Sequence, residues 1–144
     1  MKTTHTPRSL LARGFTLLEI MVVLLIIGLL LAVVAGGISG FQAGAEIQTT
    51  EAKVQSLVAQ LTQYKSLGGQ YPTQGQGIDS LHRRPGDPQP KRWVQAIKNE
   101  ADLMDTWGTK FLYRYPGSHN PTSFDVYSAG PDKQPDTSDD IGNW

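Results

Sequence analysis

The sequence predicts an α+β protein in which a long N-terminal helix, membrane-spanning in its first half, packs on a small antiparallel β-sheet. Three observations predict this fold. Every residue from Ile20 to Ala35 is apolar or glycine. Beyond that run, apolar residues recur at spacings of three, four and seven, the period of an amphipathic helix. Two runs rich in aromatic residues, 111–115 and 124–128, flank a turn with two prolines, as in paired strands.

Charge is balanced overall but unevenly distributed. The chain has 13 basic and 13 acidic residues, so it lacks the basic surplus of a nucleic-acid-binding protein. Residues 1–14 carry Lys2, Arg8 and Arg13 and no acid, and residues 15–45 carry only Glu19. A basic start before an apolar stretch predicts a cytoplasmic N-terminus. The chain contains no cysteine, which excludes disulfides, lipoprotein acylation and thiolate metal sites.

Three interpretations compete for the apolar segment. A secretory signal peptide cleaved near Ala35 has an apolar region of roughly 7–15 residues, and the run here is longer. A plain signal anchor leaves the acidic Glu19 without a role. The third interpretation, which we adopt, is a prepilin: Gly14-Phe15-Thr16-Leu17-Leu18-Glu19 resembles the motif of prepilin peptidases. These enzymes cleave after the glycine and N-methylate the new terminal phenylalanine.

A charge argument supports the third interpretation. An acid inside a membrane helix costs about 2.5–3.5 kcal/mol on insertion scales. Cleavage after Gly14 leaves a free ammonium group on Phe15. In a low-dielectric filament core, this ammonium group can neutralise Glu19 of a neighbouring copy. We therefore predict that Gly14 and Phe15 form the processing site and that Glu19 directs assembly into a homopolymer.

The amphipathic half of the helix is predicted to pack against its own domain. Its apolar stripe consists of Ile47, Val54, Leu57, Val58, Leu61 and Tyr64, and Gly68-Gly69 predicts its end. The four glycines between the halves, Gly36, Gly37, Gly40 and Gly44, cost up to about 1 kcal/mol each in a helix interior. They predict a bendable segment or, alternatively, close helix packing. The expected organisation is a leader (1–14), a transmembrane and polymerisation helix (15–40) and a periplasmic globular domain (41–144).

The connections are predicted from turn-forming residues. Residues 70–81 are expected to form a turn that leads into a short helix or loop, and residues 82–92 a basic, proline-rich loop. Short helical or irregular structure is expected over 93–103. A turn at 105–108 leads into the first predicted strand.

The last segment is acidic, with four aspartates between Asp132 and Asp140. Carboxylates and backbone carbonyls are the ligands that Ca²⁺ takes, with about six to eight oxygens in its shell. The spacing is not that of an EF-hand, because Thr137 and Asn143 stand where that loop needs Gly and Glu. A solvated acidic tail is the alternative. The apolar Ile141 and Trp144 favour a segment that docks onto the fold.

Together these segments resemble the major pseudopilins of bacterial type II secretion systems, the general secretion pathway protein G family. The resemblance rests on residues 14–23, Tyr71-Pro72-Thr73 with Gln76-Gly77, Trp107-Gly108, and Gly130-Pro131-Asp132 with residues 139–144. It implies a Ca²⁺ ion held by the side chains of Asp132, Asp139 and Asp140 and by backbone carbonyls near Ala129 and Gln134. Three departures are present: Gly36 and Thr106 stand where the family has proline, and Lys133 where it favours glycine.

The resemblance also implies a function and partners. Such a chain is a structural subunit, not an enzyme, that polymerises from the bacterial inner membrane into a short periplasmic filament and helps to drive folded proteins through an outer-membrane pore. The implied partners are the prepilin peptidase, minor pseudopilins and an inner-membrane assembly platform.

Three alternative functions remain. A type IV pilus or competence pilin often carries a C-terminal disulfide loop, and this chain has no cysteine. A membrane-anchored periplasmic enzyme is disfavoured because its histidines are scattered and no nucleophile motif is present. An adhesin would use the loops 82–92 and 116–122.

Overall fold

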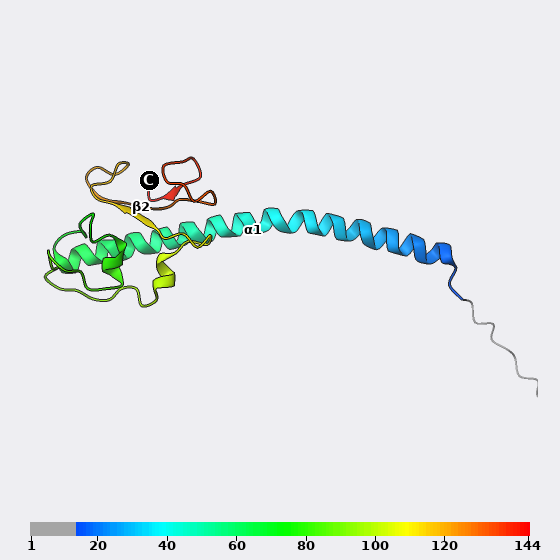
Figure 1. Cartoon of the computed structure of the whole chain (residues 1–144), viewed down its shortest axis with the longest axis horizontal. Coiled ribbons are helices and arrows are strands. Elements are labelled where there is room, and N and C mark those ends of the chain that lie inside the picture. Colours follow the sequence, from blue (N-terminus) through cyan, green and yellow to red (C-terminus); the bar gives the residue numbers. More distant parts are fainter. Residues whose placement is uncertain (1–13) are drawn as a thin grey trace, which may run out of the picture. The chain divides into compact units, whose positions relative to one another are not determined.

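The computed structural model describes residues 14–144, except for the side chains of residues 35–41. It divides into two compact units, one ending at Gly40 and the other comprising Phe41–Trp144. Helix α1 (Leu17–Gly68) contributes its first part to the former unit and its second part to the latter (Figure 1). The expected leader lies outside the described residues apart from Gly14.

The first unit contains the apolar part of α1. Leu17–Val34 has a mean hydropathy of 3.2 and is long and apolar enough to cross a membrane. Its large side chains are exposed to solvent in the isolated chain, as expected for a surface that lipid or other helices cover. The backbone is helical at Gly36, Gly37, Gly40 and Gly44.

The second part of α1 ends where the sequence predicts. Gly69 has a φ of 92°, a left-handed conformation that glycine adopts without steric cost. Its N–H donates to the carbonyl of Lys65 at 2.7 Å, which satisfies one of the last helical carbonyls. The helix therefore stops at a glycine cap.

The second unit contains a three-stranded antiparallel sheet. Its order is β1 (Leu112–Arg114), β2 (Asp125–Ser128) and β3 (Ile141–Gly142). Tyr127 of β2 pairs with Leu112 on one side and with Gly142 on the other. The two predicted strands are confirmed. The sequence did not predict β3, because two residues are too short to show a strand period.

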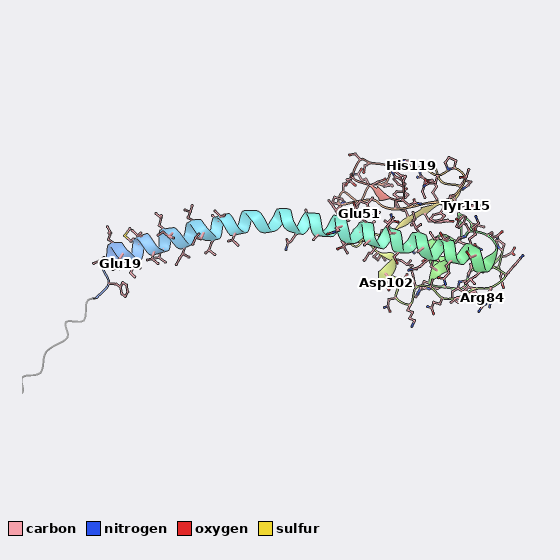
Figure 2. All side chains as sticks on the ribbon, turned by 180° about the vertical axis from the view of Figure 1, so that it is seen from behind. Glu19, Glu51, Arg84, Asp102, Tyr115 and His119 are labelled. Atoms are coloured by element: carbon pink, nitrogen blue, oxygen red, sulfur yellow. The ribbon has the colours of Figure 1, made fainter. Side chains whose placement is uncertain are left out.

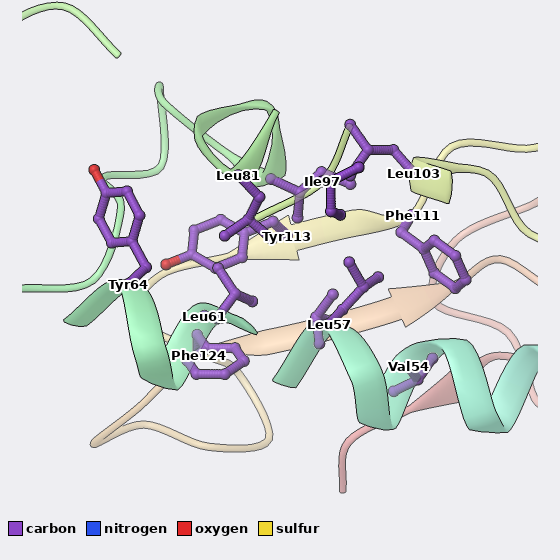
Figure 3. Packing of buried hydrophobic residues seen from close by; sticks show 12 residues of the cluster. Val54, Leu57, Leu61, Tyr64, Leu81, Ile97, Leu103, Phe111, Tyr113 and Phe124 are labelled. Carbon is purple, nitrogen blue, oxygen red and sulfur yellow. The ribbon is translucent and has the colours of Figure 1, made fainter. Parts of the chain in front are cut away.

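The hydrophobic core lies between α1 and the sheet (Figure 3). Burial of each large apolar side chain contributes about 1.5–3 kcal/mol. Two short 3₁₀-helices, η1 (Ile78–Leu81) and η2 (Glu100–Leu103), close this core. The buried cluster consists of Val54, Leu57, Leu61, Tyr64, Ile78, Leu81, Ile97, Leu103, Phe111, Tyr113, Phe124 and Val126. All of these residues belong to the second unit, so that unit contains its own core.

One member of the predicted apolar stripe lies outside this core. Ile47 is 42% exposed, and its assignment to the packed face was wrong. Among the residues of α1 whose side chains the structure describes, Thr50 is the first that is buried. One turn earlier the fold contacts the helix at Glu46 through Trp107, and this contact leaves the Ile47 side chain uncovered.

Candidate assembly and cation sites

The start of α1 is organised by a threonine cap. The N–H of Glu19 donates to Thr16 Oγ1 at 3.2 Å and to the Thr16 carbonyl at 3.1 Å. Threonine followed three residues later by glutamate is a capping-box sequence. This local signal identifies Thr16 as the residue that caps the helix. Gly14 and Phe15 precede this cap and are not helical. Their peptide bond therefore lies in non-helical, exposed chain.

Glu19 lies in the first turn of this apolar helix. Negative charge there is stabilised by the unpaired N–H groups of the helix start. Within residues 14–144, no Lys, Arg or His forms an ion pair with Glu19. Phe15, four positions earlier, is 79% exposed. The two predicted processing residues and the predicted assembly residue thus lie together at the helix start, and Glu19 has no ion-pair partner within residues 14–144.

The acidic loop, defined here as residues 130–140, is tightly turned. Gly130 has a φ of 67°, and a Cβ on it would approach the carbonyl oxygen of Asp139 to 2.5 Å and its Oδ2 to 2.7 Å. Lys133 and Asp136 also have positive φ, at 60° and 66°. Only glycine fits the first position, because the loop closes against its own backbone there.

Backbone N–H groups and one hydroxyl donate hydrogen bonds to the aspartates of this loop. The N–H of Gln134 donates to Asp132 Oδ1 at 2.8 Å, and the N–H of Asp132 donates to Asp139 Oδ2 at 3.3 Å. The Thr137 hydroxyl donates to Asp139 Oδ1 at 2.6 Å. This hydroxyl outweighs desolvation and holds the pKa of Asp139 below its usual range. These donors therefore favour the ionised form of Asp139.

Asp140 is the least satisfied carboxylate of the acidic loop. Its Oδ2 accepts a hydrogen bond from the Asp136 N–H at 2.9 Å, but its Oδ1 is buried and has no hydrogen-bond partner. A buried, unpaired carboxylate oxygen is costly and fits a cation at that point. Across residues 14–144, however, no three His, Cys, Asp or Glu side chains converge closely enough to hold a metal ion. The donors fit Ca²⁺ in kind, and carbonyl oxygens would have to complete its shell.

The remaining predicted ligands flank this group. Ala129 is buried at the end of β2, and the Gln134 carbonyl accepts a hydrogen bond from the Thr137 hydroxyl at 3.1 Å. The structure thus places all five predicted ligand residues on one loop and its entrance.

The chain after the acidic loop docks onto the fold, as its apolar residues predicted. Ile141 enters β3 and packs against the core. Trp144 stacks on His119 with ring centres 3.8 Å apart and meets Tyr127 edge-on at 5.4 Å. These contacts exclude a loose, solvated tail for this segment.

A buried carboxylate that the sequence did not reveal supports the entrance to the acidic loop. Asp105 Oδ1 accepts hydrogen bonds from the N–H groups of Trp107 at 3.0 Å and Thr109 at 2.7 Å. Its Oδ2 accepts the Ser128 hydroxyl at 2.6 Å, and Ser128 Oγ in turn accepts the Gly130 N–H at 3.1 Å. The turn at 105–109 therefore positions the first residue of the acidic loop.

The same turn is tied to α1. The hydroxyls of Thr106 and Thr50 are hydrogen-bonded at 2.8 Å, and Trp107 Nε1 donates to Glu46 Oε2 at 3.0 Å. Thr106 stands where the resemblance led us to expect proline. The hydrogen bond to Thr50 gives the Thr106 side chain a partner on α1 at the position where the family has proline.

A second buried carboxylate holds the β1–β2 connection. Asp125 accepts hydrogen bonds from the N–H groups of Ser118 at 2.6 Å, His119 at 2.9 Å and Asn120 at 3.0 Å. Burial by itself raises the pKa of Asp125, but these donors and the Asn120 amide outweigh it and leave the pKa lowered. Asp125 therefore has a structural role.

Comparison with known proteins agrees with this geometry. Residues 38–144 match the family described as type II secretion system (T2SS), protein G, and residues 11–35 match the prokaryotic N-terminal methylation motif. The type II secretion system core protein G of Dickeya chrysanthemi is 41% identical over 133 residues, which cover 92% of this chain and 86% of that protein. The protein of the same name from Pseudomonas aeruginosa is 38% identical over 135 residues, covering 91% of this chain and 94% of that protein.

A solved structure shares the fold. The crystal structure of the major pseudopilin from the type 2 secretion system of enterohaemorrhagic Escherichia coli superposes with a TM-score of 0.64 at 32% identity. The match covers 73% of this chain and 87% of that one.

Proposed function

This chain belongs to the type II secretion system protein G family, the major pseudopilins, and from that premise we propose how its own residues serve filament assembly. Members of this family are structural subunits. We propose that the chain is cleaved between Gly14 and Phe15 and then polymerises through the apolar half of α1. The Phe15 ammonium group of one copy neutralises Glu19 of the next.

The observation that carries this proposal is the construction of the helix start. The cap at Thr16 leaves Gly14 and Phe15 outside the helix, where a peptidase can reach the bond between them. The same cap places Glu19 in the first turn of a membrane-length apolar segment without an ion pair inside residues 14–144. A carboxylate in that setting needs an external cation, and the new N-terminus of a neighbour supplies one.

Mass spectrometry of the membrane-extracted protein tests the cleavage step. The expected N-terminal peptide begins at Phe15 and carries one added methyl group. Retention of residues 1–14, or a start after Ala35, leaves no ammonium group at Phe15 and contradicts the proposal.

We further propose a location and partners. The apolar segment Leu17–Val34 anchors the subunit once in the inner membrane, with Phe41–Trp144 in the periplasm, where the filament grows. The prepilin peptidase processes the subunit, and minor pseudopilins and an inner-membrane platform assemble it. The basic residues before Phe15 support this orientation.

We also propose that the acidic loop binds Ca²⁺ through the side chains of Asp132, Asp139 and Asp140, with the carbonyls near Ala129 and Gln134. The support is the donor chemistry of the loop and the unpaired buried Oδ1 of Asp140. A bound divalent cation would offset the four aspartates of this loop, which contains one basic residue, Lys133. Among the residues of the loop, the backbone N–H of Gln134 and the Thr137 hydroxyl orient the carboxylates.

A further inference from the structure

A groove lined by both apolar and polar side chains lies on the second unit beside the last turns of α1. We call it the Val94 groove. It has a volume of about 230 Å³. Its apolar lining consists of Tyr64, Leu67, Leu81, Val94 and Ala96, and its polar lining of Gln60, Gln63, Arg92 and Gln95. Val94 is 50% exposed, so an apolar side chain on its rim contacts little of its own fold. A groove of this size accommodates one large side chain.

The rim of this groove is basic. Residues 82–98 carry five basic side chains, Arg83, Arg84, Lys91, Arg92 and Lys98, against one acid, Asp87. Arg83 pairs with Glu100 at 3.3 Å. The other four basic side chains are exposed and form no ion pair within residues 14–144. This surface therefore favours an acidic occupant.

A complementary surface lies elsewhere on the same unit. Trp144 is 48% exposed although one ring face is covered by His119. Glu51 lines one hollow beside it and forms no ion pair within residues 14–144. Two further acids lie nearby, but Asp136 pairs with Arg114 at 3.2 Å and Asp140 is a proposed Ca²⁺ ligand. We call this surface the Trp144 ridge. The ridge combines an exposed aromatic side chain with the unpaired carboxylate of Glu51, and the Val94 groove combines a partly apolar hollow with positive charge.

The two surfaces occupy different levels along α1. The ridge lies beside helix residues 48–55, and the groove beside residues 60–67. Twelve residues of helix correspond to about 18 Å. Figure 2 shows Glu51 and Arg84 at opposite ends of the second unit. A contact between groove and ridge therefore joins two parallel copies head to tail, the heterologous arrangement that extends a filament without closing it.

We propose that the Trp144 ridge of one copy docks in the Val94 groove of a second copy, with Arg92 facing Glu51, the unpaired carboxylate beside Trp144. This inference rests on the proposed filament and adds an interface outside the membrane helices. Buried tryptophan and arginine commonly dominate the energy of protein interfaces. The opposite charges of the two surfaces set the orientation of the docked copy.

The chain contains no cysteine, so only introduced cysteines can form a disulfide between two copies of it. The test co-expresses two differently tagged full-length copies, one with Gln95→Cys beside the groove and one with Ser138→Cys beside the ridge. Oxidation of intact membranes is expected to give the disulfide-linked heterodimer. Adding Arg92→Glu to the Gln95→Cys copy is expected to lower its yield about tenfold, the effect of losing about 1.4 kcal/mol.

Lys98→Glu is the matched control, because it reverses the same charge on the same loop but lines a different hollow. It is expected to leave the yield of heterodimer unchanged. Filaments that form without the heterodimer, or an Arg92→Glu yield equal to that of the control, overturn the docking contact alone. Failure of the unmodified chain to form filaments would instead overturn the proposed function, and the contact with it.

Discussion

The Ser128 hydroxyl donates a hydrogen bond to Asp105 Oδ2 at 2.6 Å, and both residues are buried. This bond joins the end of β2, where the acidic loop begins, to the turn that contacts α1 through Thr106. Because Asp105 also accepts two backbone N–H groups of this turn, its carboxylate joins β2 to the turn that contacts α1. The start of the acidic loop and the packing of the turn against the helix therefore depend on a common residue.

Asp105→Ala is expected to lower the free energy of unfolding of the second unit by about 3 kcal/mol, because it leaves several buried donors unpaired. Urea denaturation of residues 41–144, followed by tryptophan fluorescence, measures the change. Asp102→Asn, at an exposed acid, is the control and should change stability by less than about 0.5 kcal/mol. Equal effects of the two substitutions would contradict a structural role for Asp105.

Glu19→Gln is expected to leave membrane insertion intact and to abolish normal filament assembly, because the neighbouring ammonium group then lacks its counter-charge in a low-dielectric core. Electron microscopy of filaments and membrane fractionation measure the two effects separately. Asp102→Asn, at an exposed acid of the second unit, removes the same charge elsewhere. Filaments of normal length and number from Glu19→Gln would refute the pairing with Phe15.

Calcium is expected to stabilise the second unit. At a free concentration 100 times the dissociation constant, binding to the folded state alone adds about 2.7 kcal/mol, seen as a higher melting temperature and slower proteolysis of residues 41–144. EGTA should reverse both effects. Asp139→Asn should remove the response, whereas Asp87→Asn, outside the acidic loop, should retain it. A melting temperature that does not respond to EGTA would rule out a stabilising cation in the acidic loop.

Lys133→Gly is expected to stabilise the acidic loop. Lys133 has a φ of 60°, and an L-residue in that conformation costs about 1–2 kcal/mol relative to the right-handed region. Glycine is the residue that the family resemblance predicted at this position. Calorimetric titration should show tighter Ca²⁺ binding by the variant, with Lys133→Ala as the control that removes the charge and keeps the strained backbone. If both substitutions tighten Ca²⁺ binding equally, the cause is the loss of the lysine charge and not the relief of backbone strain.

The stability of the second unit is expected to fall in acid partly through Asp125. Its folded pKa is lowered by the backbone donors around it, whereas the unfolded value is about 3.9. As the pH falls below about 5, the unfolded chain therefore takes up the proton first. The contribution of Asp125, fully present above that range, is lost as the pH passes through the folded pKa.

Urea denaturation of wild type and Asp125→Asn between about pH 2 and 7 measures this contribution. The variant should be less stable at neutral pH, and the difference between the two proteins should shrink toward low pH. A difference that is constant with pH would show that the charge of Asp125 does not contribute.

Local patterns were sufficient to predict much of this protein. The uninterrupted apolar run after Glu19 predicted a membrane-length helix, and the recurring apolar residues from Val54 to Tyr64 predicted the packed half of α1. Gly69 gave its end, because a left-handed cap is a local conformation that glycine favours. The two longer strands were predictable for the same reason, since each run rich in aromatic residues beside the turn is visible within five residues.

Only the tertiary structure decided which polar groups meet. Thr50 and Thr106 are 56 positions apart in the chain, and Asp105 and Ser128 are 23 apart. No periodicity connects such residues, because the helix and the turns must first pack before their buried donors find acceptors. The short strand β3 and the exposure of Ile47 were decided in the same way, by where the sheet begins to cover the helix.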